Sequence, residues 1–281
     1  MFFKEWEILL VDDDPDLLQI STLAMKNFNI YGLPLNVHTA RSKAEAIELL
    51  QTRPEIQWGL AVALIDVVME SDTAGLELCE AIRALPGKKI TQLYIRTGQP
   101  GIAPERSVID QYDINGYFTK TEVSEQKLYS LVRSGVRQFF WSTIMEAVLT
   151  FHELFLATAG SREILTERFQ MFMQRLDAGV GVGFKRCYMA GGSIVELSGM
   201  DEATARAMIA KMDQQPGTPL SDVGDKVVAG EDDFLLIKAA AQPGRAESFG
   251  LMQTAFESPI TAVALVHRMF AGLGTAWHHA G

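Results

Sequence analysis

The sequence predicts an α/β fold, a doubly wound sheet of five parallel strands followed by a long connecting helix and a second, α+β domain. Short apolar runs alternate five times with amphipathic stretches over residues 1–123. An unbroken helical pattern then occupies 124–160, and residues 161–281 combine helical stretches with strands that are punctuated by glycine and proline. Regular strand–helix alternation is typical of parallel sheets, and segregated strands and helices are typical of α+β domains.

The composition is that of a globular protein. The 281 residues are enough for two domains of ordinary size, and contents of 48% hydrophobic and 21% charged residues argue against disorder. The formal net charge of −10 argues against a broad nucleic-acid-binding face. The two cysteines, Cys79 and Cys187, match no disulfide or metal pattern, which favours a reducing compartment.

The chain has no segment with the pattern of a signal peptide or a membrane span. The opening residues, MFFKEWEILL, carry charges among their apolar side chains and have no small-residue cleavage site. The most apolar late stretch, residues 260–274, is interrupted by His267 and Arg268 and is too short to cross a bilayer. We therefore expect a cytoplasmic protein with no membrane partner and no nucleic-acid partner.

Hydrophobic periodicity and helix-start signals define the expected elements of the first domain. The nearly continuous apolar run at 59–67 is typical of a central parallel strand. Pro15 occupies a favourable first-turn position of a helix, and Ser42 a capping position. The expected strands are 7–11, 35–40, 59–67, 92–98 and 116–120, and the expected helices are 15–28, 42–50, 74–85 and 103–113.

The connecting helix carries an apolar stripe that is too wide for a solvated linker. We expect this stripe to pack on a partner or on the second domain, and Gly160 to end the helix. The stripe comprises Leu128, Val132, Val136, Phe139, Ile144, Val148 and Phe155. For the second domain we expect helices at 162–176, 201–212 and 258–279, strands at 179–192, 232–241 and 248–256, and a loop at 213–226.

Polar side chains stand where four of the expected strands end. These are the acidic turn 12–14 after the first strand, Asp66 after the third, Thr97 after the fourth and Lys120 after the fifth. The carboxyl ends of parallel strands meet at one edge of the sheet, so we expect these side chains in one cleft. An acidic turn taken alone also fits a helix cap, and three adjacent carboxylates repel one another.

This set of side chains points to phosphoryl chemistry. Asp12, Asp13 and Asp66 would form an oxygen-only site for a hard divalent ion, for which Mg²⁺ is the best fit. Asp66 would then be a carboxylate nucleophile that attacks phosphorus in line. Lys120 and the metal ion would neutralise the transferred group, and Thr97 could donate a hydrogen bond to one of its oxygens. The metal would also offset the repulsion among the clustered aspartates.

Residues 1–123 resemble the receiver domain of two-component response regulators. The resemblance rests on the segments LLVDDDPDLL, ALIDVVME with GLELCEAIR behind it, YIRTG and GYFTK. It implies phosphorylation of Asp66, an acidic pair formed by Asp12 and Asp13 with Asp14 beside it, and a metal-binding backbone carbonyl at Val68. It also implies that Thr97 is the switch hydroxyl, Tyr117 the switch aromatic and Lys120 the phosphate-binding cation.

Three features depart from the usual receiver pattern. Glu70 stands where these domains usually have proline, and the loop that leads to Gly75 is about one residue longer than usual. Thr121 replaces the proline that commonly follows the lysine, so the approach of Lys120 is open to question. These departures leave open a degenerate receiver.

The segment RTGQPGIAPERSVIDQYDINGYFTK is similar to one branch of receivers, which precedes a domain of unknown function in cyclic-di-GMP phosphodiesterase regulators of the HD-GYP type. That resemblance implies a GAF-like fold for residues 161–281. The sequence itself has no adjacent His-Asp pair for a phosphodiesterase metal site, no cyclase signature and no ATP-binding glycine box.

We therefore expect a response regulator that is not an enzyme beyond its own phosphoryl transfer. A sensor histidine kinase or phosphotransfer protein would phosphorylate Asp66, and Thr97 and Tyr117 would rearrange. The long helix would pass the change to the GAF-like domain through the geometry of a homodimer or through partner binding. Two alternatives remain, a sensor whose second domain binds a small ligand and an adaptor that acts in trans on a separate effector protein.

Overall fold

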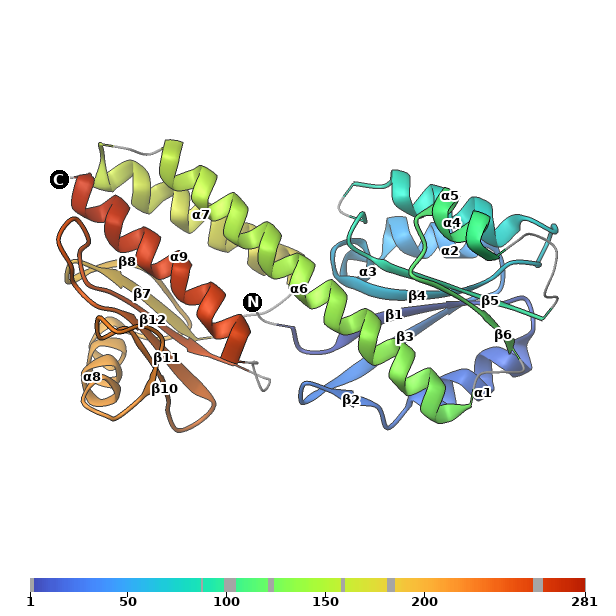
Figure 1. The fold of residues 1–281 in the computed structure, drawn as a ribbon, viewed down its shortest axis with the longest axis horizontal. Coiled ribbons are helices and arrows are strands. Elements are labelled where there is room, and N and C mark those ends of the chain that lie inside the picture. Colours follow the sequence, from blue (N-terminus) through green and yellow to red (C-terminus); the bar gives the residue numbers. More distant parts are fainter. Residues whose placement is uncertain are drawn as a thin grey trace. The chain divides into compact units, whose positions relative to one another are not determined.

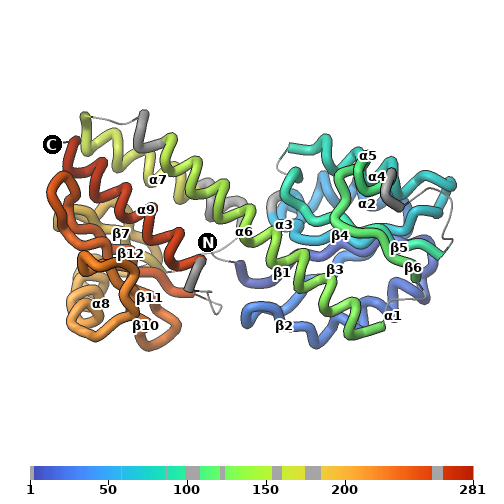
Figure 2. Tube along the Cα trace, in the orientation of Figure 1, coloured from blue at the N-terminus to red at the C-terminus, as the bar shows by residue number. Residues whose placement is uncertain are grey.

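The structure is a computed structural model that describes residues 3–86, 88–98, 105–120, 124–157, 160–180, 185–254 and 260–280. The chain divides into two compact units, a first unit with Phe3–Thr143 and a second unit with Ile144–Gly281. The expected boundary after residue 123 falls before helix α6 (Glu125–Ala157). The first part of α6 belongs to the first unit, and its last part belongs to the second (Figures 1 and 2).

The first unit contains a six-stranded sheet in the order β2-β3-β1-β4-β5-β6. Its strands are β1 (Trp6–Val11), β2 (Asn29–Ile30), β3 (Leu33–Ala40), β4 (Leu60–Asp66), β5 (Gln92–Thr97) and β6 (Gly116–Thr119). The five expected strands pair in parallel, with β1 between β3 and β4. The prediction of five strands missed β2, an antiparallel edge strand of two residues, because so short a strand has no periodicity to detect.

Helices cover both faces of this sheet (Figure 1). They are α1 (Pro15–Met25), α2 (Lys43–Thr52), α3 (Pro54–Gly59), α4 (Ala74–Ala84) and α5 (Glu105–Tyr112), together with the first part of α6. Helices α1 and α6 lie on one face, and α2 to α5 lie on the other. As expected, α1 begins at Pro15, and the Ser42 hydroxyl caps α2 by accepting a hydrogen bond from the Glu45 amide.

The first part of α6 packs on the sheet of the first unit. Leu128, Val132, Val136 and Phe139, members of the expected apolar stripe, are all buried there. A Cβ atom added at Gly135 would lie 2.8 Å from the Val62 side chain, so the helix backbone approaches β4 closely. The expectation that this part of the stripe packs on a partner or on the second domain is therefore wrong, since the first unit itself covers it.

The second unit contains an antiparallel sheet in the order β8-β7-β12-β11-β10-β9. Its strands are β7 (Arg186–Ala190), β8 (Ser193–Ser198), β9 (Thr218–Pro219), β10 (Lys226–Ala229), β11 (Phe234–Ala239) and β12 (Ser248–Gln253). Its helices are α7 (Arg162–Val180), α8 (Glu202–Asp213) and α9 (Ile260–His279), with the last part of α6. Helix α8 covers one face of the sheet, and the other three helical segments cover the opposite face (Figure 1).

Aromatic side chains fill the core between these three helical segments and the sheet. Phe151 of α6 contacts Phe169 and Phe172 of α7, with ring centroids 5.2 and 5.5 Å apart. Tyr188 of β7 continues the cluster toward Phe270 of α9. Within the described parts of the chain, no helix combines the length and the apolarity that crossing a membrane requires.

Two details of the second unit differ from the sequence prediction. The strand expected over 179–192 spans only β7, because α7 continues to Val180 and residues 181–184 lie outside the described residues. Gly191 and Gly192, with φ of 55° and 81°, make the turn that leads directly into β8. The loop expected at 213–226 contains β9 and the first residue of β10, two strands that the sequence prediction missed.

Lys88 is a buried cation that makes the free energy of unfolding of the first unit depend on pH. Its side chain is 2% exposed, its ammonium group donates a hydrogen bond to the Ile56 carbonyl, and burial lowers its pKa to about 8. The unfolded chain retains the ordinary pKa of about 10.5, so between these two values the unfolded state binds more protons. The free energy of unfolding therefore rises with pH across this window.

Replacing Lys88 with methionine is expected to stabilise the protein by about 1–2 kcal/mol near pH 7, since the gain exceeds the loss of one hydrogen bond. The advantage should shrink toward zero above about pH 10. Urea denaturation of wild type and variant at several pH values measures this difference. Lys89→Met is the control, because that neighbouring side chain is exposed. A difference that does not change with pH would contradict the assignment.

Candidate functional site

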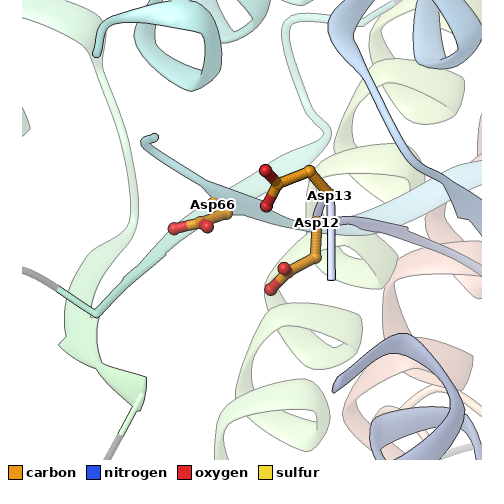
Figure 3. Close-up of side chains that lie close together, drawn as sticks. All are labelled: Asp12, Asp13 and Asp66. Carbon is orange, nitrogen blue, oxygen red and sulfur yellow. The ribbon is translucent and has the colours of Figure 1, made fainter. Parts of the chain in front are cut away.

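Three carboxylates gather at the carboxyl edge of the first sheet. Strands β1 and β4 are neighbours, with Val11 paired to Ile65, so Asp12 and Asp66 emerge side by side. One carboxylate oxygen from each of Asp12, Asp13 and Asp66 lies within 4.8 Å of the others. Figure 3 shows the three carboxylates at the ends of the two strands. Asp12 and Asp66 are buried, with 0% and 4% exposure, whereas Asp13 is exposed.

The acidic turn after β1 contains the expected helix cap. The Asp14 side chain caps α1, accepting hydrogen bonds from the amides of Asp16 at 2.9 Å and Leu17 at 3.3 Å. The Asp14 amide in turn donates to Oδ1 of Asp12 at 3.1 Å. Asp14 thus belongs to the helix start and fixes the turn, and Asp12 and Asp13 remain with the carboxylate cluster.

Lys120 joins the two buried carboxylates. It follows β6, and its Nζ lies 2.7 Å from Oδ2 of Asp66 and 2.9 Å from Oδ2 of Asp12. Burial disfavours the ammonium charge, but hydrogen bonds to both carboxylates more than offset it and raise the pKa of Lys120 above 10.5. Lys120 therefore carries a positive charge at neutral pH. The departure at Thr121 lies outside the described residues.

Asp66 occupies an environment that disfavours its charge. Burial, with a contribution from the neighbouring Asp12, raises the pKa of its carboxyl group, although Lys120 acts in the opposite direction. Its Oδ2 pairs with Lys120, and the Val67 amide also favours the charged carboxylate, but its buried Oδ1 has no hydrogen bond of ordinary geometry from any described residue. An added cation or hydrogen-bond donor at this oxygen would therefore stabilise the ionised carboxylate.

The other expected site residues surround this edge of the sheet. Thr97 is the buried last residue of β5 and is paired with Thr119, next to Lys120. Val68 is half-buried in the loop after Asp66, and Tyr117 lies half-buried on β6 against the core under α4 and α5. The roles of Val68 and Tyr117 in the site remain predictions.

Sequence reasoning missed Arg96, which lies one residue before Thr97. Its guanidinium group donates to Oδ2 of Asp12 at 3.2 Å and to the Ser21 hydroxyl of α1 at 2.8 Å. Arg96 is 6% exposed. An arginine inside an otherwise buried strand needs an acidic or polar partner, and this signal was present in the segment YIRTG.

The departure at Glu70 has a structural explanation. Oε1 of Glu70 accepts a hydrogen bond from the Lys43 amide, 2.9 Å away in the first turn of α2. The Lys43 ammonium pairs with Glu77 of α4, and Glu77 accepts a hydrogen bond from Thr73. The loop between β4 and α4 is therefore attached to both flanking helices, and Glu70 takes part in this attachment rather than in the carboxylate cluster.

Gly75 holds the same loop against the Asp66 backbone. Its amide donates to the Val67 carbonyl at 3.0 Å, and a Cβ atom there would lie 1.9 Å from the Asp66 carbonyl oxygen. Gly75→Ala is expected to lower the free energy of unfolding by about 2 kcal/mol in chemical denaturation, because backbone must move. Gly59→Ala is the matched control, since its Cβ would make an ordinary 3.5 Å contact. Equal stabilities of the two variants would contradict this packing.

The donor set fits a hard divalent cation. Three carboxylates supply oxygen atoms only, which is the preference of Mg²⁺ and of related hard ions. Oδ1 of Asp66 is buried without a well-formed hydrogen bond from the described part of the chain, which adds a structural reason for a positive group at this place. Asp12, Asp13 and Asp66 are the residues that would hold the ion.

Part of this chain is similar to known proteins. No family model matches it. In its N-terminal half it is 42% identical over 136 residues to 3'3'-cGAMP-specific phosphodiesterase 2 of Vibrio cholerae serotype O1. The match covers 48% of this chain and 25% of that protein, so the chain spans only about a quarter of the relative.

Solved structures with similar folds include receiver domains. One is a signal receiver domain of an HD domain-containing protein from Pseudomonas fluorescens Pf-5, with 21% identity, a TM-score of 0.42 and coverage of 51% of this chain and 95% of that one. Another is a response regulator receiver domain from Clostridium thermocellum, with 19% identity, a TM-score of 0.40 and coverage of 47% and 95%.

Proposed function

We propose that the first unit is a receiver that accepts a phosphoryl group on Asp66 in a Mg²⁺-dependent reaction. The observation that carries this proposal is the bridging of Asp66 and Asp12 by Lys120, beside Asp13, at the carboxyl edge of a doubly wound sheet. The strand order, with β1 between β3 and β4, is that of flavodoxin-like folds, in which ligands bind outside the carboxyl ends of the strands.

The proposed transfer uses the residues of this cluster. A carboxylate oxygen of Asp66 attacks phosphorus in line, and the bond from phosphorus to the donor breaks as the donor leaves with its electron pair. The product is an acyl phosphate on Asp66. Lys120 stays beside Asp66 to neutralise the phosphoryl oxygens, and Thr97 donates its hydroxyl hydrogen to one of them. A bound Mg²⁺ would supply further charge neutralisation during this transfer.

The phosphodonor we propose is a sensor histidine kinase or a phosphotransfer protein. Phosphorylation would change the positions of Thr97 and Tyr117 and so the surface near β6, from which the chain continues toward α6. Helix α6 supports a route to the second unit, because Val136 is buried in the first unit and Phe151 in the core of the second.

We propose a GAF-like output role for the second unit and a homodimer for the whole chain. The antiparallel sheet with helices on both faces supports the first proposal. Exposed apolar side chains on α6 and α7 support the second, since such side chains favour association. They are Met145, Leu149, Ile164 and Met171, with exposed fractions between 45% and 61%.

The similarity to a cyclic dinucleotide phosphodiesterase supports a proposal about output. We propose that this chain controls such an enzyme, either as a separate protein in trans or as a part of a longer chain. A pull-down of a cyclic dinucleotide phosphodiesterase by the phosphorylated and the unphosphorylated chain tests this proposal. The rate at which the captured enzyme hydrolyses its substrate is then measured. A rate that is the same with phosphorylated and unphosphorylated protein would contradict it.

Titration of wild-type protein with beryllofluoride, with and without Mg²⁺, tests the receiver proposal. Beryllofluoride imitates a phosphoryl group on a carboxylate, and its binding can be followed by tryptophan fluorescence. We expect saturable binding that requires Mg²⁺, and light scattering in the same samples measures any change in oligomeric state. A folded protein that binds no beryllofluoride at saturating Mg²⁺ would be a degenerate receiver.

A further inference from the structure

Arg96 places a permanent positive charge beneath the carboxylate cluster. It is the charged residue of strand β5, whose six positions are all buried, and it is 6% exposed. Guanidinium groups do not lose their proton in proteins, so this charge is present at every accessible pH. Because an unpaired buried charge is costly, the contacts of Arg96 identify the group that it neutralises.

The main partner of Arg96 is Asp12, the most buried carboxylate of the cluster. Nη2 of Arg96 and Nζ of Lys120 lie 3.2 and 2.9 Å from the same oxygen, Oδ2 of Asp12. Nη1 of Arg96 donates to the Ser21 hydroxyl at 2.8 Å, which fixes the guanidinium group against α1. The three carboxylates and two cations together leave one net negative charge, whereas Lys120 alone would leave two.

We propose that Arg96 is a built-in counter-ion that competes with the divalent cation for Asp12. In the metal-free protein it stabilises the acidic cluster, and in the presence of metal it repels the incoming ion. Metal binding is then weak until a phosphoryl group adds negative charge to the site, so that metal and phosphoryl group bind cooperatively. This inference rests on the proposed metal site, and in it Arg96 sets the affinity of that site for the ion.

Removal of the charge should change metal affinity and metal-free stability in opposite directions. In Arg96→Met, calorimetric titration with Mg²⁺ alone should give a dissociation constant at least about tenfold lower than that of wild type, because a nearby like charge has gone. The melting temperature in the presence of a chelator should fall, because Asp12 has lost a partner. Arg96→Lys retains the charge and should bind Mg²⁺ much more like wild type.

Ser21→Ala is the matched control, because it removes the second partner of Arg96 without changing any charge. Its Mg²⁺ affinity should stay within about twofold of wild type. If Arg96→Met does not fold, Arg96→Gln offers a polar, uncharged side chain in its place, and the same tighter Mg²⁺ binding is expected. A folded, uncharged variant whose Mg²⁺ affinity is unchanged or weaker would overturn the inference.

The same samples distinguish failure of this inference from failure of the proposed function. If wild type binds beryllofluoride with Mg²⁺ but the uncharged variants show no gain in affinity for Mg²⁺ alone, the role of Arg96 is wrong and the receiver proposal stands. If neither wild type nor any variant takes up Mg²⁺, with or without beryllofluoride, both proposals fail together.

Discussion

Replacing Asp66 with asparagine is expected to abolish Mg²⁺-dependent beryllofluoride binding and, at the same time, to stabilise the metal-free protein by about 1 kcal/mol. The amide cannot form the acyl-phosphate-like bond that the analogue imitates. It also carries no charge, which removes the repulsion with Asp12 and the cost of burying the anion. The net upward shift in the pKa of Asp66 indicates that these outweigh its ion pair with Lys120, and Lys120 keeps Asp12 as a partner in the variant. Asp66, the proposed phosphorylation site, would therefore lower the free energy of unfolding of the metal-free protein.

The pH dependence of this difference follows from the direction of the pKa shift. Burial raises the pKa of Asp66 above 3.8, so the wild-type protein loses stability relative to the variant as the pH rises from about 3.8 through the folded-state pKa. Thermal melts should thus show no advantage of Asp66→Asn below this window and the full advantage near neutrality. Asp72→Asn, an exposed change in the same loop, is the control. A lower melting temperature of Asp66→Asn at neutral pH would contradict the account.

Lys120→Met is expected to have the largest effect on stability. The ammonium group lies between Asp66 and Asp12, so its removal leaves two buried carboxylates without their shared partner. Breaking a buried ion pair from one side costs about 3–5 kcal/mol, and we expect about 3 because Arg96 still pairs with Asp12. Beryllofluoride affinity should also fall by at least about a hundredfold, since Lys120 would contact the bound anion.

The pH dependence of the free energy of unfolding identifies the ion pairs of Lys120 as the cause. The pKa of Lys120 lies above 10.5, so its contribution to stability is fully present below that value and is lost as the pH rises through the folded-state pKa. Urea denaturation of Lys120→Met should therefore approach wild type only at high pH. Lys89→Met serves as control, because Lys89 is exposed away from the site. Equal stability of the Lys120 and Lys89 variants at neutral pH would be incompatible with the bridging geometry.

The meeting of Asp12 and Asp66 could be predicted from the sequence because the carboxyl ends of neighbouring parallel strands share one edge of a sheet. The same rule placed Thr97 and Lys120 near them. The cap made by Asp14 was also visible, since a short acidic side chain before Pro15 is a common start of a helix. These features depend on local pattern and on strand order alone.

The contact of Arg96 with Asp12 could not be predicted, because a sequence shows that a buried charge needs a partner but not which side chain reaches it. Likewise, the stripe on α6 indicated burial, yet the covering surface depends on the tertiary packing of Trp6, Val62 and Tyr94. Short strands such as β2 and β9 have too few residues for a periodic signal. The sequence therefore leaves open which side chains and surfaces meet outside the shared edge of the parallel strands.

The most direct test of the central claim is to look for the covalent phosphoryl group on Asp66. Wild-type protein is incubated with a small phosphodonor such as acetyl phosphate and Mg²⁺, and intact-mass spectrometry is followed by borohydride reduction and peptide mapping. The account predicts one alkali-labile phosphoryl group, on Asp66, that requires Mg²⁺ and is absent from Asp66→Asn. A folded protein that gains no phosphoryl group, or gains it on another residue, would contradict the account.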